Sequence, residues 1–360
     1  MQLPVNVFHG QRFFKLVYCF SKNMKKFICF IPLVLSLCAG CVSEEKRPYP
    51  KVATTAVPGD ADDCAIWVNS ANSSSSLVIG NDKRPYGGLF VWDMNGRLVY
   101  RTRTLSRPNG VDIRCAIDFY GEKIDVVVCG IRSTNEIKIF QIEPKKRILI
   151  DITSGEKIFT GYSADTYGLR LYKRRTDGKL FAFATCKAKD DIHQIAFEED
   201  GQGGLKGRFI RAFGGKDMQS FVEGMCADDE AGYLYCSDER QGILKYEADP
   251  DKNNDGLIHK FAIEDGIKGD REGIGLYEMP GNAGYLVLSS QGNSSFKIYK
   301  REGNNDFVKT VYPRGVTRTD GIAVTSKAIL PLFPKGVVVC HNDEGCNFVL
   351  FDWGEFFSAN

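Results

Sequence analysis

The sequence predicts a six-bladed β-propeller, and two landmarks that repeat along the chain support this fold class. The first is a polar residue, usually followed by glycine and an aliphatic residue, that recurs at intervals of about fifty residues. The second is a short alternating strand that ends on a large residue and keeps step with the first. Repeats of this length with strand-like content are typical of propeller blades, so six copies predict six blades. The first landmark lies at Asp63, Asn109-Gly110, Tyr167-Gly168, Glu223-Gly224, Glu272-Gly273 and Asp320-Gly321, and the second at residues 89–92, 137–140, 193–195, 244–246, 297–299 and 348–351.

The composition supports an all-β chain built from hairpins. The sequence has 37 glycines and many Asn-Gly, Asp-Gly and Gly-Gly pairs, which are typical of tight turns between strands. Helical periodicity is absent beyond an apolar run near the N-terminus. A β-sandwich or two small β domains are the alternative architectures. The formal net charge of +2 argues against a nucleic acid as a partner.

The last blade is expected to be completed by the beginning of the domain. The chain stops soon after the third strand of the sixth blade, near Trp353. A strand within residues 51–57 can supply the fourth strand, and this pairing closes the ring without a free edge. We therefore expect one propeller domain over residues 51–357, present as a monomer.

Residues 1–50 are expected to lie outside the propeller. Residues 24–41 combine a basic start after Met24, an apolar core and a final Cys41, which is typical of a bacterial lipoprotein signal. Residues 1–23 are then an upstream extension before the better start at Met24, and residues 42–50 form a polar tether. This interpretation predicts a lipid on Cys41 that anchors the domain to a membrane surface of the bacterial cell envelope, in the periplasm or on the outer surface.

Eight cysteines follow Cys41, and six of them flank predicted turns in pairs. Residues at equal distances from a hairpin turn face each other across the strands, which permits a disulfide. Three pairs of buried free thiols are the alternative. Cys64 and Cys186 have no hairpin partner and are expected to be core residues. The predicted disulfides join Cys115 to Cys129, Cys226 to Cys236, and Cys340 to Cys346.

Acidic residues recur at the start of the predicted innermost strands. These starts lie on one face of a propeller, so the side chains should converge on the mouth of the central channel. Several carboxylates on one rim repel each other unless cations bind between them, and all-oxygen ligation favours Ca²⁺. We therefore predict a site for several calcium ions, with a solvated acidic rim as the alternative. The predicted ligands are Asp62, Asp63, Asp112, Glu223, Glu272 and Asp320, with Asp270 close by.

The loops between second and third strands divide the mouth into a basic and an acidic half. Basic side chains that face a site for several cations are the arrangement expected for binding a small polyanionic substrate, above all one with several phosphates. The four histidines have no zinc-ligand spacing, and phosphate-loop and Gly-x-Ser-x-Gly motifs are absent. Blades one to three carry Lys83-Arg84, Arg132 and Lys187, whereas blades four to six carry Asp238-Glu239, Gln291 and Asp343-Glu344.

Four motifs are similar to those of a known family: Asp62-Asp63-x-Ala65-Ile66-Trp67, Glu223-Gly224-Met225, Ser289-Ser290-Gln291-Gly292-Asn293 and Thr319-Asp320-Gly321-Ile322. From about residue 59 to residue 353 the chain resembles the β-propeller phytases, calcium-dependent phosphatases that act on inositol hexakisphosphate. In two places the chain departs from the family. Gly110 stands where the family often has a ligating asparagine, and Arg314 and Arg318 stand in a loop that is commonly acidic. The resemblance implies calcium-site positions at Asp63, Asp112, Glu223, Asp238 or Glu239, Asp270, Glu272, Gln291 and Asp320, and phosphate-binding positions at Lys83, Arg132, Tyr167 and Lys187.

These observations lead to the hypothesis of a calcium-dependent phosphomonoesterase of the 3-phytase type, in which a metal-activated water attacks phosphorus. Lys83, Arg132 and Lys187 would neutralise phosphate charge, and Tyr167 would donate a hydrogen bond. One alternative is a non-catalytic, calcium-organised propeller that binds anionic ligands at the cell surface. Another is a lactonase-like metal hydrolase, which would need one tightly bound cation at the centre of the channel.

Overall fold

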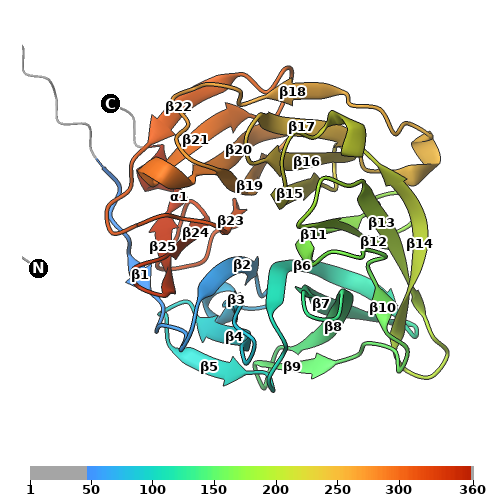
Figure 1. The fold of residues 1–360 in the computed structure, drawn as a ribbon. Helices are drawn as coiled ribbons and strands as arrows, with labels where there is room; N and C mark the ends of the chain where they lie inside the picture. Colours follow the sequence, from blue (N-terminus) through green and yellow to red (C-terminus); the bar gives the residue numbers. More distant parts are fainter. Residues whose placement is uncertain (1–46, 358–360) are drawn as a thin grey trace, which may run out of the picture. The chain divides into compact units, whose positions relative to one another are not determined.

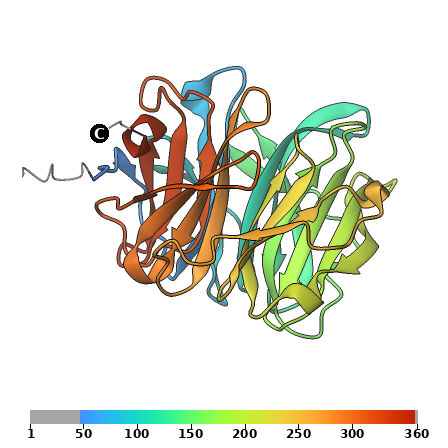
Figure 2. The ribbon, with the colours of Figure 1, turned by 90° about the horizontal axis from the view of Figure 1, so that it is seen from above.

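The computed structural model describes residues 47–357, and these residues form six antiparallel sheets around a central channel (Figure 1). Each sheet is one blade, and in all but the second and the last blade the strands follow one another outward in chain order. The predicted six-bladed propeller is therefore confirmed. In the view turned by 90°, the sheets stand side by side around the ring (Figure 2).

The first three blades follow one another without interruption. Blade one contains β2 (Ala61–Trp67), β3 (Leu77–Asp82), β4 (Gly88–Asp93) and β5 (Leu98–Arg101). Blade two contains β6 (Pro108–Phe119), β7 (Glu122–Ile131), β8 (Glu136–Glu143), β9 (Ile148–Asp151) and β10 (Ile158–Phe159). Blade three contains β11 (Thr166–Lys173), β12 (Leu180–Cys186), β13 (Ile192–Glu199) and β14 (Leu205–Phe213).

The remaining blades include the one that closes the ring. Blade four contains β15 (Val222–Asp228), β16 (Tyr233–Asp238), β17 (Gly242–Glu247) and β18 (His259–Phe261). Blade five contains β19 (Arg271–Met279), β20 (Ala283–Ser290), β21 (Ser295–Lys300) and β22 (Phe307–Val311). Blade six contains β23 (Ile322–Thr325), β24 (Val337–Asn342), β25 (Asn347–Asp352) and β1 (Val52–Ala53), and the short helix α1 (Trp353–Phe356) follows it.

The ring closes through the N-terminal strand, as the sequence predicts. β1 is the outermost strand of blade six, and Val52 pairs with Leu350 of β25. Figure 1 shows the blue β1 beside the red β25. This pairing satisfies the backbone edge that a three-stranded last blade would expose.

The first landmark marks the innermost strands, where the regular pairing is interrupted. Between Val222 and Met225, the register of β15 against β16 shifts, and β2, β6, β11 and β19 shift at the equivalent place. Such bulges re-aim side chains at the end of a strand. The glycine of the landmark allows neighbouring blades to approach closely. A Cβ added to Gly224 would lie 2.0 Å from the backbone oxygen of Glu272, and one added to Gly273 would lie 2.6 Å from that of Asp320.

The second landmark marks the third strand of each blade. Its large residues, among them Trp92, Tyr246, Tyr299 and Phe351, are fully buried in the apolar layers between sheets. The burial of these side chains between neighbouring sheets holds successive blades together.

The disulfide prediction is wrong, because the strand register does not bring the paired cysteines face to face. Cys226 lies opposite Tyr235, whereas Cys236 lies opposite Met225. A shift of one residue places the two side chains on opposite faces of the sheet. Cys129 lies opposite Val111, and Cys340 lies opposite Val349. All eight cysteines of the described part of the chain are free thiols.

The described chain begins at Arg47, and its first residues pack against the loop that precedes blade six. The guanidinium of Arg47 donates to the backbone oxygen of Tyr312 at 3.0 Å, and Arg314 donates its backbone N–H to Pro48 at 2.9 Å. Within residues 47–357, no helix is long and apolar enough to span a bilayer. The predicted signal, extension and lipidated Cys41 lie outside the described residues.

Candidate active site at the channel mouth

A polar pocket of about 240 Å³ lies where the innermost strands begin and the second-to-third-strand loops turn. The first two strands of each blade form an antiparallel hairpin. The start of the first strand and the loop after the second strand therefore lie at the same end of the channel. Apart from Phe221, every residue that lines the pocket was predicted as a site residue from the sequence. The lining residues are Lys83, Tyr167, Lys187, Phe221, Glu223, Glu239, Asp270, Glu272, Gln291 and Asp320.

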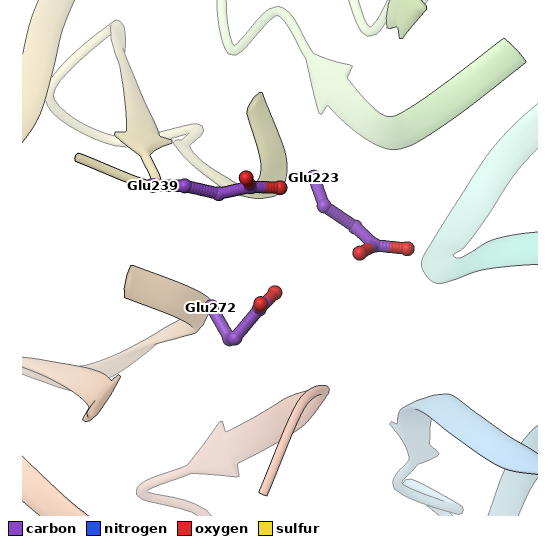
Figure 3. Close-up of side chains that lie close together, drawn as sticks. All are labelled: Glu223, Glu239 and Glu272. Carbon is purple, nitrogen blue, oxygen red and sulfur yellow. The ribbon is translucent and has the colours of Figure 1, made fainter. Parts of the chain in front are cut away.

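Three carboxylates meet on the acidic side of this pocket. One oxygen each of Glu223, Glu239 and Glu272 lies within 4.8 Å of the others. The three side chains come from β15, from the loop after β16 and from β19, and they lie close together (Figure 3). Carboxylate oxygens at this spacing suit a hard divalent cation such as Ca²⁺. We call Glu223, Glu239 and Glu272 the carboxylate cluster.

The electrostatics of the cluster favour a bound cation. Burial, followed by the charge of Asp62, raises the pKa of Glu223 to about 8. Burial, followed by the charges of Glu223 and Asp320, raises the pKa of Glu272 well above its usual range. Burial and the charge of Asp270 also raise the pKa of Glu239. The raised pKa values mean that the protonated forms are favoured more than in a free glutamate, whereas a bound cation would favour the ionised forms.

Asn109 supports the cluster from the second blade. Its amide nitrogen donates to Oε1 of Glu223 at 2.8 Å and to the backbone oxygen of Tyr167 at 2.5 Å. Its Oδ1 is buried and has no hydrogen-bond partner in the described part of the chain. Oδ1 of Asn109 is thus a buried acceptor that lacks a donor and belongs to a residue in contact with the carboxylate cluster. It is a further oxygen that suits a bound cation as a ligand.

The basic side of the pocket is organised around the ring of Tyr167. The ammonium of Lys187 lies 4.9 Å from the ring centroid, and the guanidinium carbon of Arg132 lies 5.2 Å from it. Asp165 pairs with Arg132 at 3.4 Å and with Arg107 at 3.0 Å. Arg132 is therefore beside the pocket and held by Tyr167 and Asp165.

Lys83 lies between two of the predicted ligands. Its Nζ is 2.8 Å from Oδ1 of Asp62 and 3.7 Å from Oδ2 of Asp320. Burial alone would raise the pKa of Asp62, but the charge and hydrogen bond of Lys83 outweigh it and hold the pKa below its usual value. Burial and the charge of Asp62 raise the pKa of Asp320 to about 6, and the amide of Gln291 donates to the Asp320 carboxylate.

Four predicted ligands do not line this pocket: Asp62, which pairs with Lys83, and Asp63, Asp112 and Asp238. Asp238 is fully buried and accepts backbone N–H groups on both sides of its loop, for example from Gln219 at 2.7 Å and Arg240 at 3.1 Å. It stabilises the loop that presents Glu239, so of this pair Glu239 faces the pocket. Asp63 and Asp112 lie deeper in the channel, paired with arginines.

The two arginines of the sixth-blade loop are engaged elsewhere. The guanidinium of Arg314 lies 4.6 Å from the ring centroid of Tyr49. Arg318 forms an ion pair with Asp343, with its Nε 2.8 Å from a carboxylate oxygen.

Sequence reasoning missed Asn109, Asp165 and Arg170 as residues of the site and the channel. Asn109 belongs to the first landmark, so its position was visible although its role was not. A charged residue between Leu169 and Leu171 in an apolar innermost strand was a signal for Arg170. Nothing in the local sequence indicates that Asp165 contacts Arg132.

The fold and the site together define a six-bladed propeller with a metal-competent carboxylate cluster in a pocket that Lys83 and Lys187 also line. The Phytase family model matches residues 35–349. The chain is 32% identical over 347 residues to the 3-phytase of Bacillus subtilis (strain 168), a match that covers 89% of each chain. The chain belongs to the phytase family.

Proposed function

We propose that this protein is a calcium-dependent phosphomonoesterase that hydrolyses phosphate from phytate (inositol hexakisphosphate) or related inositol phosphates. The main observation behind the proposal is that carboxylates and lysines line the same pocket of about 240 Å³. The carboxylate cluster lines this pocket together with Lys83 and Lys187. A polyphosphate could contact bound cations and protein cations at the same time.

The carboxylate cluster would hold calcium, with oxygens of Asp270, Asp320 and Gln291 nearby. Bound calcium would polarise a phosphoryl oxygen and lower the pKa of a water molecule. The number of negatively charged groups around the pocket suits more than one ion.

The protein's own side chains would bind and orient the phosphates. Lys187 and Arg132 carry fixed positive charge beside the ring of Tyr167 and would neutralise the transferred phosphate and its neighbours. Tyr167 donates its hydroxyl to Glu239 at 3.3 Å and would redirect it to a phosphate oxygen. Burial, followed by the charge of Glu223, raises the pKa of Tyr167, which keeps this hydroxyl a donor.

The family relationship supports this function, because the Bacillus subtilis relative bears the name 3-phytase. No specific observation favours the alternatives. A lactonase-like hydrolase would need a single cation at the centre of the channel, and the guanidinium of Arg170 lies there. We also propose that the protein is a monomer anchored to the bacterial cell envelope through a lipid on Cys41, as the sequence of residues 24–41 indicates.

Phosphate release by the purified protein tests the proposal. Phytate should be hydrolysed in millimolar calcium and not in the presence of a chelator, and calcium added back should restore the activity. Calcium binding without phosphate release from phytate or any lower inositol phosphate would instead support the non-catalytic alternative.

A further inference from the structure

Arg170 crosses the centre of the channel below the carboxylate cluster. It belongs to the innermost strand β11 and is only 8% exposed. Its guanidinium lies 3.5 Å from Oδ2 of Asp63 and 3.8 Å from Oδ1 of Asp112, and it donates to the backbone oxygen of Val111 at 3.2 Å. Three oxygens from blades one and two therefore converge on one cation that the chain itself supplies.

The two carboxylates have further partners that occupy their lone pairs. Asp63 accepts the backbone N–H of Cys64 and that of Val111, each at 2.9 Å. Asp112 accepts the backbone N–H of Ile113 at 2.8 Å and that of Leu171 at 2.9 Å. The bonds from Val111 and Leu171 each connect the innermost strand of one blade with that of the next.

A second guanidinium completes the neutralisation of Asp112. Arg114 lies 2.9 Å from Oδ2 of Asp112 and 2.7 Å from Oδ2 of Asp229. Burial disfavours the charge of Arg170, but the charges of Asp63 and then Asp112 outweigh it and raise the pKa of Arg170. A divalent ion placed between Asp63 and Asp112 would face two fixed positive charges, which makes its binding unfavourable.

Arg170 also divides the channel into two compartments. On the side of the mouth it lines a small cavity of about 20 Å³ together with Asp62, Glu223 and Glu272. On the other side it lines a cavity of about 290 Å³ with Arg114 and Asp229. Among the residues that line these two cavities, Arg170 is shared by both.

We propose that Arg170 is a built-in cation of the channel, which occupies the place between Asp63 and Asp112 where oxygens from two blades could otherwise bind a metal ion. Asp63 and Asp112 then bind no calcium in this protein, although the resemblance suggested both as calcium positions. Calcium binding is confined to the channel mouth, and the centre of the ring stays neutralised at any calcium concentration, because a guanidinium remains charged and cannot dissociate.

Equilibrium dialysis with radioactive calcium on the purified protein tests this inference without reference to hydrolysis. Asp63→Asn and Asp112→Asn should each bind as many calcium ions per chain as the wild type. Arg170→Ser removes the guanidinium and leaves two carboxylates and a carbonyl oxygen, so it should bind one ion more. Arg170→Lys is the matched control, since it keeps the charge and should gain none.

Circular dichroism shows whether each variant folds. If Arg170→Ser folds only in the presence of calcium, the extra ion has replaced the lost cation, which supports the proposal. Loss of one bound ion in folded Asp63→Asn or Asp112→Asn would overturn it, and so would a folded Arg170→Ser that gains none. If the variants do not fold, anomalous diffraction from wild-type crystals in calcium decides: density at Glu223 and Glu272 but not between Asp63 and Asp112 is expected, and density there contradicts the proposal.

Discussion

The hydroxyl of Tyr167 lies 3.3 Å from Oε1 of Glu239, while its ring lies beside the charged groups of Lys187 and Arg132. One side chain from blade three thus connects the basic half of the mouth with the carboxylate cluster. One substitution of Tyr167 can remove the hydroxyl alone, and another can remove the ring as well. The two contributions to the site can therefore be measured separately.

Tyr167→Phe should lower kcat/KM for phytate several-fold, because it removes one hydrogen-bond donor worth about 1 kcal/mol and keeps the ring. Tyr167→Ala should cost more and should raise KM, because Lys187 and Arg132 lose the aromatic surface that holds them. Steady-state kinetics of both variants measure the difference. Equal losses in the two variants would show that the ring does not position the cations.

Glu272→Gln and Lys187→Ala should separate the two halves of the pocket. Glu272→Gln removes a cluster carboxylate, so a higher calcium concentration should be needed for half-maximal activity. Lys187→Ala should leave this requirement nearly unchanged and should cost about 2–4 kcal/mol of transition-state stabilisation on phytate. The loss should be smaller on an ester with a single phosphate.

Two matched variants serve as controls for this pair. Glu278→Gln changes an exposed carboxylate on the same strand as Glu272, and Lys189→Ala changes an exposed base in the same loop as Lys187. Neither residue lines the pocket at the mouth. The division into halves is wrong if Glu272→Gln and Lys187→Ala change the calcium requirement equally.

The calcium-free protein should lose stability as the pH rises from about 4.5 to about 8, the interval between the usual pKa of Glu223 and its value in the folded protein. In this interval the folded state keeps a proton that the unfolded chain has released, so the free energy of unfolding falls with rising pH. Thermal melting in a chelator measures the effect. Glu223→Gln should weaken the pH dependence.

Saturating calcium should remove or reverse this trend, because calcium binds the ionised carboxylates of the folded state. The increase in melting temperature caused by calcium should therefore grow with pH. An increase that is the same at pH 5 and pH 8 would argue against ligation by groups of raised pKa.

Reducing agent should leave the melting temperature unchanged, because all eight cysteines of residues 47–357 are free thiols. Alkylation of the unfolded, unreduced chain followed by peptide mapping should find each of them labelled. A protected pair among them would contradict the strand register.

Cys41→Ser should release the protein from membranes without changing its melting temperature, because the predicted lipid attachment site precedes the propeller. Fractionation of cells that express either form provides the measurement. A variant that still sediments with membranes would indicate a different anchor.

The blade count and the position of the pocket could be predicted from the sequence, because both depend on the spacing of residues along the chain. Each blade is a local unit, so Glu223-Gly224 and Glu272-Gly273 recur at the same step of successive innermost strands. Recurrence at the same step of a closed ring places side chains on the same face. This argument also identified Glu239 and Lys187, which lie on the loops of that face.

Which of two neighbouring carboxylates faces the mouth was decided by the tertiary structure. The bulge at the start of β2 directs Asp62 toward Lys83 and Asp63 toward Arg170, and the loop after β16 buries Asp238 and exposes Glu239 to the pocket. One residue of register reverses the direction of a side chain, and the same shift separates Cys226 from Cys236. The contact between Asn109 and Glu223 spans 114 residues of sequence, and only the closure of the ring brings the two together.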